Sequence, residues 1–166
     1  MAQSATFVPK EFNVPAKLET KDFRLRMLTV NDVVKDYDAV VSSTQHLKTI
    51  WPGGSWPDGL TIEQNLIDLG WHQKEFQTRR SFAYTVVTPS ESQVTGCVYI
   101  VPARKPGYDA EVYLWARQSE LAGGLESRLY AAVREWLAGE WPFKKAAFPG
   151  RDIDWETWRG ISDAAP

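Results

Sequence analysis

The sequence predicts an α/β (α+β) domain in which helices cover both faces of a mixed, mostly antiparallel sheet. Three observations lead to this fold class. The expected elements follow one another in the order β-α-α-β-β-β-α-β. Short turns join the three central β-rich runs, which makes them antiparallel, and a helix connects the last two strands, which makes those two parallel. The 166 residues are enough for one such domain.

The first elements follow from alternation and helical spacing. Residues 1–17 are polar and contain two prolines, so we expect a loosely attached N-terminal arm. In "DFRLRML", Phe23, Leu25 and Met27 alternate with polar residues, which indicates a half-exposed strand. A helix follows, and Asn31 or Asp32 is able to cap it. Its predicted apolar stripe consists of Val33, Val34, Tyr37, Val40 and Val41.

The middle of the chain alternates turn signals with regular elements. Residues 44–60 mix prolines, glycines and tryptophans, which predicts a long loop. Thr61 and Gln64 have the spacing of a capping box, so a helix should run from there to about Arg79. "SFAYTVVT" and "QVTGCVYIVP" then form a hairpin across "PSES", and "AEVYLWAR" is the third strand.

The last part of the chain contains one helix and one short strand. Two glycines precede an amphipathic helix over about 125–138, and "KKAAF" is the final strand. We place the domain at residues 18–150, and residues 151–166 form an irregular tail packed on it or trailing from it. The predicted helix stripe consists of Leu125, Leu129, Val133, Trp136 and Leu137.

Composition narrows the classes of function. A net charge of −2 gives no electrostatic footprint for nucleic acid. No run reaches membrane-spanning length, and the first residues lack the apolar core of a signal peptide. The single cysteine, Cys97, excludes an internal disulfide and a multi-cysteine metal site, and it fits a reducing compartment. We therefore expect a cytoplasmic protein without a metal, a nucleic-acid partner or a membrane partner.

Two stretches resemble the GNAT family, the GCN5-related N-acetyltransferases. "LETKDFRLRMLTVND" at 18–32 resembles the "LETERLRLRPL" pattern that opens the branch acetylating the N-termini of ribosomal proteins. "AEVYLWA" at 110–116 is similar to the "AEIGYWL" of that branch's fourth strand. The resemblance covers about residues 18–150. It implies a GNAT-like sheet without the usual C-terminal helix and strands, because too few residues follow 150.

The resemblance implies acetyl-CoA as cosubstrate. In the family, its pantetheine arm pairs with the fourth strand's backbone. Its pyrophosphate binds amide N–H groups of the loop that opens the next helix, where unpaired donors and the helix dipole attract anions. An acceptor amine, deprotonated by a base, attacks the thioester directly. The implied contacts are Leu114, Trp115, Ala116 and Arg117 of the strand, and Gly123, Gly124, Leu125, Glu126 and Ser127 of the loop.

The loop departs from the family pattern, Gln/Arg-x-x-Gly-x-Gly/Ala followed three residues later by leucine. Anchoring that leucine on Leu129 puts the first glycine on Gly124, the second on Glu126 and the Gln/Arg position on Leu121. A carboxylate in a first helical turn is otherwise favourable by about 0.3–1 kcal/mol. Two interpretations stay open: the loop no longer binds phosphate, or a shifted loop presents Gly123 and Gly124 to phosphate and turns Glu126 outward.

The resemblance also suggests residues for the acceptor side. Glu111 matches a glutamate of the branch's fourth strand and is the expected general base; the alternative is an exposed strand glutamate paired with a neighbouring basic residue. The family's tyrosine acid has no counterpart, since no tyrosine follows Tyr130. Histidine suits proton transfer near neutral pH, and the tryptophans either cover the substrate or pack the loop down. The expected substrate contacts are His46, Trp51, Trp56 and Tyr113.

Two functional hypotheses from different classes follow. The first is an acyl-CoA-dependent N-acyltransferase that moves an acetyl group to a primary amine of a small molecule or a peptide N-terminus. The second is a catalytically silent relative that binds a ligand or a protein partner through a tryptophan-rich cleft. A homodimer is also expected as one way to cover the sheet edge that the absent final strands would leave.

Overall fold

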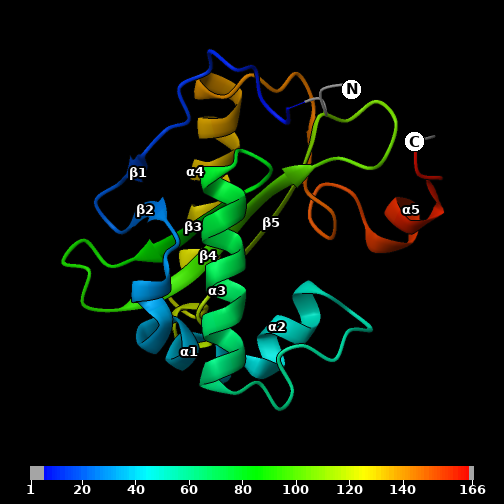
Figure 1. Cartoon of the computed structure of the whole chain (residues 1–166). Coiled ribbons are helices and arrows are strands. Elements are labelled where there is room, and N and C mark those ends of the chain that lie inside the picture. Colours follow the sequence, from blue (N-terminus) through cyan, green and yellow to red (C-terminus); the bar gives the residue numbers. More distant parts are fainter. Residues whose placement is uncertain (1–5, 165–166) are drawn as a thin grey trace.

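The computed structural model describes residues 6–164 and shows one mixed sheet between two layers of helices (Figure 1). This is the fold class that the sequence predicts. The strands are β1 (Lys17–Glu19), β2 (Arg24–Met27), β3 (Phe82–Val87), β4 (Val94–Pro102), β5 (Ala110–Ala116) and β6 (Ala146–Ala147). The helices are α1 (Val33–Val41), α2 (Thr44–Ile50), α3 (Ile62–Gln77), α4 (Leu125–Glu140) and α5 (Trp155–Gly160).

The sheet runs in chain order from β1 to β6. The first five strands are antiparallel neighbours, and β6 is parallel to β5 because α4 forms the crossover. The parallel contact is short: Ala110 pairs with Ala146 and Glu111 with Ala147. The remainder of β5, residues 112–116, therefore has no strand partner on this side among the described strands.

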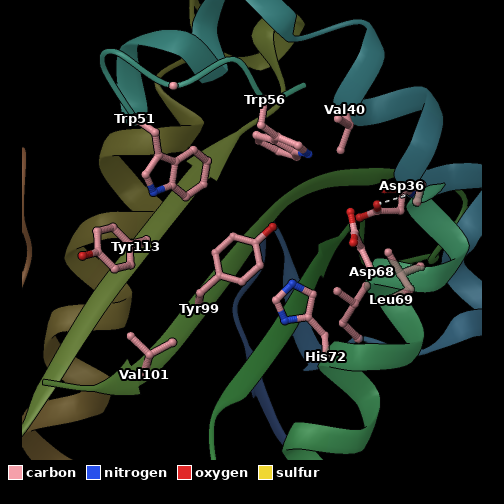
Figure 2. Close-up of a pocket in the computed structure, with 13 residues that line it drawn as sticks. Asp36, Val40, Trp51, Trp56, Asp68, Leu69, His72, Tyr99, Val101 and Tyr113 are labelled. Carbon is pink, nitrogen blue, oxygen red and sulfur yellow. Dashed lines mark hydrogen bonds between the residues drawn. The ribbon is translucent and has the colours of Figure 1, made fainter. Parts of the chain in front are cut away.

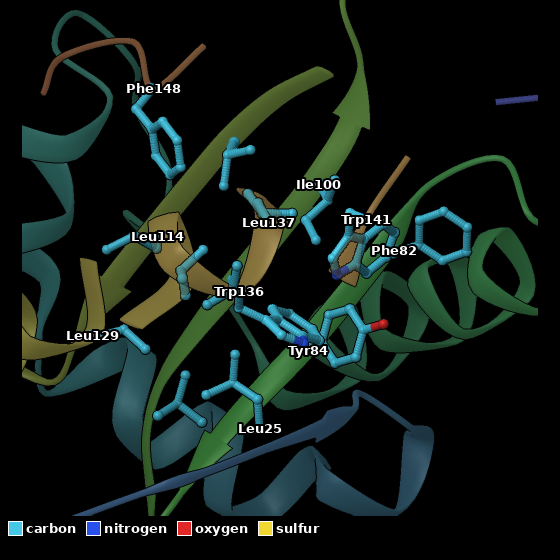
Figure 3. Packing of buried hydrophobic residues seen from close by; sticks show 14 of the residues in the cluster. Leu25, Phe82, Tyr84, Ile100, Leu114, Leu129, Trp136, Leu137, Trp141 and Phe148 are labelled. Atoms are coloured by element: carbon cyan, nitrogen blue, oxygen red, sulfur yellow. The ribbon is translucent and has the colours of Figure 1, made fainter. Parts of the chain in front are cut away.

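Two apolar cores hold the helices to the sheet. On one face, α4 buries Leu129 and Trp136 against Tyr84 and Leu114 (Figure 3). Burying an aliphatic or aromatic side chain of this size contributes about 1.5–3 kcal/mol. On the other face, α1, α2 and α3 pack over a second core whose buried residues include Leu28, Val40, Leu47, Leu69, Cys97 and Trp115. Cys97 thus packs as a small buried hydrophobe.

The start of α3 shows the predicted capping box. The Thr61 hydroxyl accepts a hydrogen bond from the Gln64 amide at 3.2 Å, and the Gln64 side chain accepts one from the Thr61 amide at 3.0 Å. These bonds satisfy two amides that the first turn leaves without helical partners. None of the helices within residues 6–164 has the length and apolar content to cross a bilayer.

Two expectations about chain ends and loops are wrong. Residues 44–60 are not one loop, because α2 occupies Thr44–Ile50 before an irregular stretch begins at Trp51. The N-terminal segment is not loosely attached: within its described part, Val8 is buried and the Phe12 ring packs 5.5 Å from Trp141. The segment carries its own apolar anchors, and these outweigh its polar composition. Residues 1–5 of the predicted arm lie outside the described residues.

The apolar stripe of α1 also differs from the prediction. Val34 and Val41 are 67% and 40% exposed, whereas Asp36 is buried. The helix is rotated so that Asp36 faces α3, where the Asn65 side chain meets it. The C-terminal tail gains a helix, α5, whose Trp158 is buried.

Candidate functional site

A cavity of about 370 Å³ lies between strands β4 and β5 and the helices α1 to α3 that cover this face of the sheet (Figure 2). We call it the aromatic pocket. Its walls come from α1, from the residues after α2, from α3 and from the two strands. The side chains that define its chemistry are Asp36, Trp51, Trp56, His72, Tyr99 and Tyr113.

Four aromatic rings form one wall of the pocket. Trp51, directly after α2, meets the Trp56 ring edge-on, with centroids 5.4 Å apart. It also lies 6.0 Å from Tyr99 and 6.2 Å from Tyr113. Those two tyrosines are cross-strand partners on β4 and β5. The register of the hairpin therefore places both rings on the face of the sheet that α1, α2 and α3 cover. The wall presents aromatic faces and edges to whatever occupies the cavity.

Asp36 brings a carboxylate into this apolar setting. Its side chain is buried, and one oxygen accepts a hydrogen bond from the Asn65 amide nitrogen at 2.9 Å. Within residues 6–164 this is the only hydrogen bond to the carboxylate, and no basic side chain forms an ion pair with it. Burial, reinforced by Asp32 and Asp68, raises the pKa of Asp36 to about 6. At neutral pH the pocket therefore contains an ionised carboxylate without a counter-ion.

His72 and Tyr99 add neutral polar groups beside that carboxylate. Burial lowers the pKa of His72 to about 4, so its imidazole is uncharged at neutral pH. Burial also raises the pKa of Tyr99, which keeps its hydroxyl protonated. Asp68 lies toward the rim, where burial raises its pKa as well. The pocket as a whole is aromatic and negatively charged.

A second polar cluster lies at the end of β5. The Glu126 carboxylate, in the first turn of α4, accepts hydrogen bonds from the Ala116 backbone amide at 2.9 Å and from His46 Nε2 at 2.5 Å. Its other oxygen accepts one from Arg151 Nη2 at 3.0 Å. Arg151 Nη2 also donates to the Leu114 carbonyl oxygen at 2.9 Å. A cavity of about 190 Å³ adjoins this cluster and includes His46, Glu126 and Arg151 in its lining.

The loop before α4 follows neither interpretation in full. Gly124 takes the left-handed backbone conformation, with φ of 75°, which a glycine adopts without steric cost. The interpretation in which Glu126 turns outward is wrong, because its side chain points at β5. Both nearby arginines are already paired: Arg128 with Asp22 and with the Gly123 carbonyl oxygen of the loop, and Arg117 with Asp38.

Glu111 is buried beside the pocket but does not line it. It is only 3% exposed, and it accepts hydrogen bonds from the Arg104 backbone amide at 2.9 Å and from the Tyr113 hydroxyl at 2.7 Å. The alternative of an exposed glutamate paired with a basic neighbour is therefore wrong. In Figure 2, the Tyr113 hydroxyl points away from the cavity, while its ring faces Trp51.

The C-terminal segment braces the pocket from outside. The Trp155 ring stacks on Tyr113, with centroids 6.2 Å apart and planes inclined by 11°. Arg159 donates a hydrogen bond to the Pro52 carbonyl oxygen at 2.7 Å. These contacts connect β5 and the stretch after α2 through a segment whose sequence pattern is irregular.

The structure brings some of the predicted site residues together and separates others. Trp51, Trp56 and Tyr113 meet in the aromatic pocket, whereas His46 lies in α2, rather than in a loop, and contacts Glu126. Of the six residues that define the chemistry of the pocket, the sequence does not predict three: Asp36, His72 and Tyr99. One signal was available for Asp36, an acidic residue at helical spacing within an apolar stripe. No group of three or more metal-ligating side chains occurs in the described part of the chain.

Comparison with known proteins identifies the class of fold. No family model matches the chain, and neither does any curated protein. Among solved structures, the similar ones are acetyltransferases of the GNAT type, so the chain has the GNAT fold.

Three of these structures illustrate the likeness. A probable acetyltransferase has a TM-score of 0.64 at 11% identity, over 80% of this chain and 72% of its own. RimJ of Mycobacterium smegmatis, in complex with CoA-disulfide, has a TM-score of 0.60 at 13% identity, over 78% of this chain and 64% of its own. The ribosomal-protein-S5-alanine acetyltransferase of Vibrio fischeri has a TM-score of 0.59 at 15% identity, over 74% of this chain and 67% of its own. The chain spans about two thirds of the length of such structures.

Proposed function

We propose that the protein is an N-acyltransferase that transfers an acyl group, acetyl in the simplest case, from a CoA thioester to an organic amine bound in the aromatic pocket. The observation that carries this proposal is the buried carboxylate of Asp36, which faces aromatic rings and has no basic partner in residues 6–164. The GNAT fold supplies the class of reaction, and the pocket supplies the class of acceptor.

The pocket chemistry favours a cation. An ionised carboxylate in an apolar site is costly unless an opposite charge accompanies it. Aromatic faces attract ammonium groups, with about 0.5–2 kcal/mol for each well-placed ring. Trp51, Trp56 and Tyr99 provide such rings in the cavity that Asp36 also lines. A cavity of about 370 Å³ suits a small organic amine or the first residue of a peptide.

The open edge of β5 is the proposed site of the acyl donor. Residues 112–116 leave backbone groups without a strand partner, and an extended ligand carrying amides can pair with such an edge. Support comes from the RimJ structure, which contains a CoA disulfide on the same fold. The proposed donor contacts are those that the resemblance implies: residues 114–117 of the strand and residues 123–127 of the loop.

The reaction requires the ammonium to lose its proton before attack. The amine nitrogen then forms a bond to the thioester carbonyl carbon, the carbon–sulfur bond breaks, and the leaving thiolate takes up the proton that the nitrogen loses as it becomes an amide. We propose Glu111 as the proton acceptor and Asp36 as the group that holds the ammonium. Glu111 reaches the pocket only if its hydrogen bond to the Tyr113 hydroxyl is released, so Tyr113 would control the approach of the base.

The test separates binding from transfer. We would titrate 2-phenylethylamine, spermidine and an alanyl tripeptide into the protein by calorimetry, with 2-phenylethanol as the uncharged match for the first. Turnover would be followed as thiol release from acetyl-CoA; Cys97 does not interfere because it is fully buried. An amine should bind at least about tenfold more tightly than the alcohol, and Asp36→Asn should remove that preference. Glu111→Gln should lower turnover with little effect on amine affinity.

The outcomes discriminate between the two hypotheses. Amine binding together with thiol release supports the transferase. Amine binding without release, in the presence of saturating acetyl-CoA, would identify a binding protein on a GNAT fold. Equal affinities for the amine and the alcohol would contradict the assignment of the pocket itself.

A further inference from the structure

The outer edge of β5 carries backbone groups that point away from β4. The Arg117 amide bonds to the Thr95 carbonyl of β4, so by the alternation of an antiparallel pair the backbone groups of Leu114 and Ala116 face the opposite edge. Among these groups are an acceptor, the Leu114 carbonyl, and a donor, the Ala116 amide. A neighbouring strand or an extended amide ligand would use both of these groups.

In the described structure, Glu126 and Arg151 already use them. Arg151 donates to the Leu114 carbonyl oxygen, the Glu126 carboxylate accepts from the Ala116 amide, and the two side chains bond to each other at 3.0 Å. The ion pair therefore presents a donor and an acceptor to the strand, as a peptide group would. A ligand that pairs with these two groups must take the same two positions.

The pair is held firmly in place. The side chains of Glu126 and Arg151 are only 16% and 19% exposed. His46 donates to Glu126, and the Arg151 guanidinium lies 5.4 Å from the centre of the Tyr130 ring. Burial opposes ionisation of Glu126, but the hydrogen bonds from His46 and Ala116 and the charge of Arg151 outweigh it and lower the pKa of the carboxyl.

The chain segment that delivers Arg151 is shaped for this position. Gly150 has a φ of 82°, and a Cβ at this residue would lie 2.5 Å from the Trp155 indole nitrogen. A larger residue would therefore push the turn away from Trp155 and move Arg151 off the strand. On the other side, Glu126 projects from the first turn of α4, next to the left-handed Gly124. Two separate segments thus converge on one edge of β5.

We propose that Glu126 and Arg151 act as an internal competitor for the acyl donor, closing the donor edge of β5 until the donor displaces them. The inference rests on the proposed function, because it takes the donor to be an amide-bearing CoA thioester. The competition has two parts. The side chains fill hydrogen-bonding positions on the strand, and the negative charge of Glu126 opposes an anionic donor near the start of α4.

The experiment measures donor affinity with the full chain. Acetyl-CoA and uncharged pantetheine would be titrated calorimetrically into the wild type, Glu126→Ala, Glu126→Gln and the control Glu120→Ala. Glu120 lies just before the same loop and also carries a negative charge, but among the described residues its side chain forms no hydrogen bond or ion pair with β5. Glu126→Ala should bind both ligands at least about tenfold more tightly than the wild type, and Glu120→Ala within about twofold of it.

Glu126→Gln separates shape from charge. Its amide oxygen still accepts from Ala116, so a gain for acetyl-CoA without a gain for pantetheine would assign most of the competition to charge. Because Glu126→Ala leaves the half-buried Arg151 without its carboxylate partner, the double variant Glu126→Gln/Arg151→Met provides a second route if the single variant unfolds. The methionine side chain cannot donate to the Leu114 carbonyl, so this double variant should bind pantetheine more tightly than the wild type.

The outcomes for the two proposals differ. Equal and tight donor binding by the wild type and the folded variants would overturn the internal competitor and leave the proposed transferase intact. Absence of donor binding in every folded variant would overturn the donor assignment of the proposed function, and the competitor with it. Tighter binding by Glu126→Ala alone, without a change in Glu120→Ala, supports both.

Discussion

Replacing Asp36 by asparagine should stabilise the free protein. The substitution keeps the shape of the side chain and an oxygen that can accept the hydrogen bond from Asn65. It removes the ability to ionise and replaces the other oxygen by an amide nitrogen. Because the carboxylate is buried without a basic partner among the described residues, its charge is a cost to the folded state rather than a contribution.

The size of the effect follows from the pKa. Burial raises the pKa of Asp36 from 3.8 to about 6. A tenfold change in a protonation equilibrium is about 1.4 kcal/mol, so ionisation costs the folded state roughly 3 kcal/mol at neutral pH. The folded state binds this proton more tightly than the unfolded state. The resulting stability is therefore complete below pH 3.8 and is lost as the pH rises through about 6.

Thermal unfolding followed by circular dichroism measures this effect. At about pH 7.5, Asp36→Asn should melt about 6–12 °C above the wild type, since 1 kcal/mol corresponds to about 2–4 °C for a chain of this size. Near pH 4 the difference should shrink toward zero. Asp68→Asn, at the exposed rim, removes only the smaller contribution that this charge makes to the pKa of Asp36 and should change the melting temperature by no more than about 2 °C. A gain that is absent at pH 7.5, or equal at both pH values, would refute the reasoning.

Three further measurements test other parts of the structure. Gly96→Ala would place a Cβ 2.2 Å from the Trp115 carbonyl oxygen and force β4 and β5 apart, so urea unfolding should show a loss of more than about 2 kcal/mol. Gly139→Ala, in the open flank of α4, should instead gain about 1 kcal/mol. Trp56→Ala should weaken amine binding at least about fivefold by calorimetry, and an unchanged affinity would remove Trp56 from the pocket's function. Light scattering should give twice the mass of the chain if a second copy covers the edge of the sheet, whereas a monomer would contradict the homodimer.

The order of the elements could be predicted from the sequence because each signal is local. The capping box at Thr61 and the hairpin before β4 depend on residues a few positions apart. By contrast, α2 has only seven residues and ends where tryptophans, prolines and glycines begin. The composition of residues 44–60 therefore predicts a loop and gives no sign of α2. The polar composition of residues 6–16 predicts loose attachment for a similar reason, although a few apolar anchors such as Val8 decide their packing.

The candidate site could be predicted only in part, because its chemistry depends on tertiary contacts. Trp51 and Trp56 draw notice by residue type alone. Asp36 acquires its character from burial against Asn65, a residue 29 positions later, which no local pattern shows. Likewise, the sequence places Glu126 in the first turn of a helix but does not predict the direction of its side chain. Its inward direction depends on Arg151, which comes from a segment without regular periodicity.

The hydrogen bond from Arg159 to the Pro52 carbonyl links parts of the chain 107 positions apart. Helix α5 has six residues, too few to persist without tertiary contacts. Its backbone amides should therefore exchange with deuterated solvent through local opening, at a rate that depends on how well residue 52 is held. A ligand that fixes the stretch after α2 would slow this exchange. The C-terminal turn would then report occupancy of a cavity that it does not itself line.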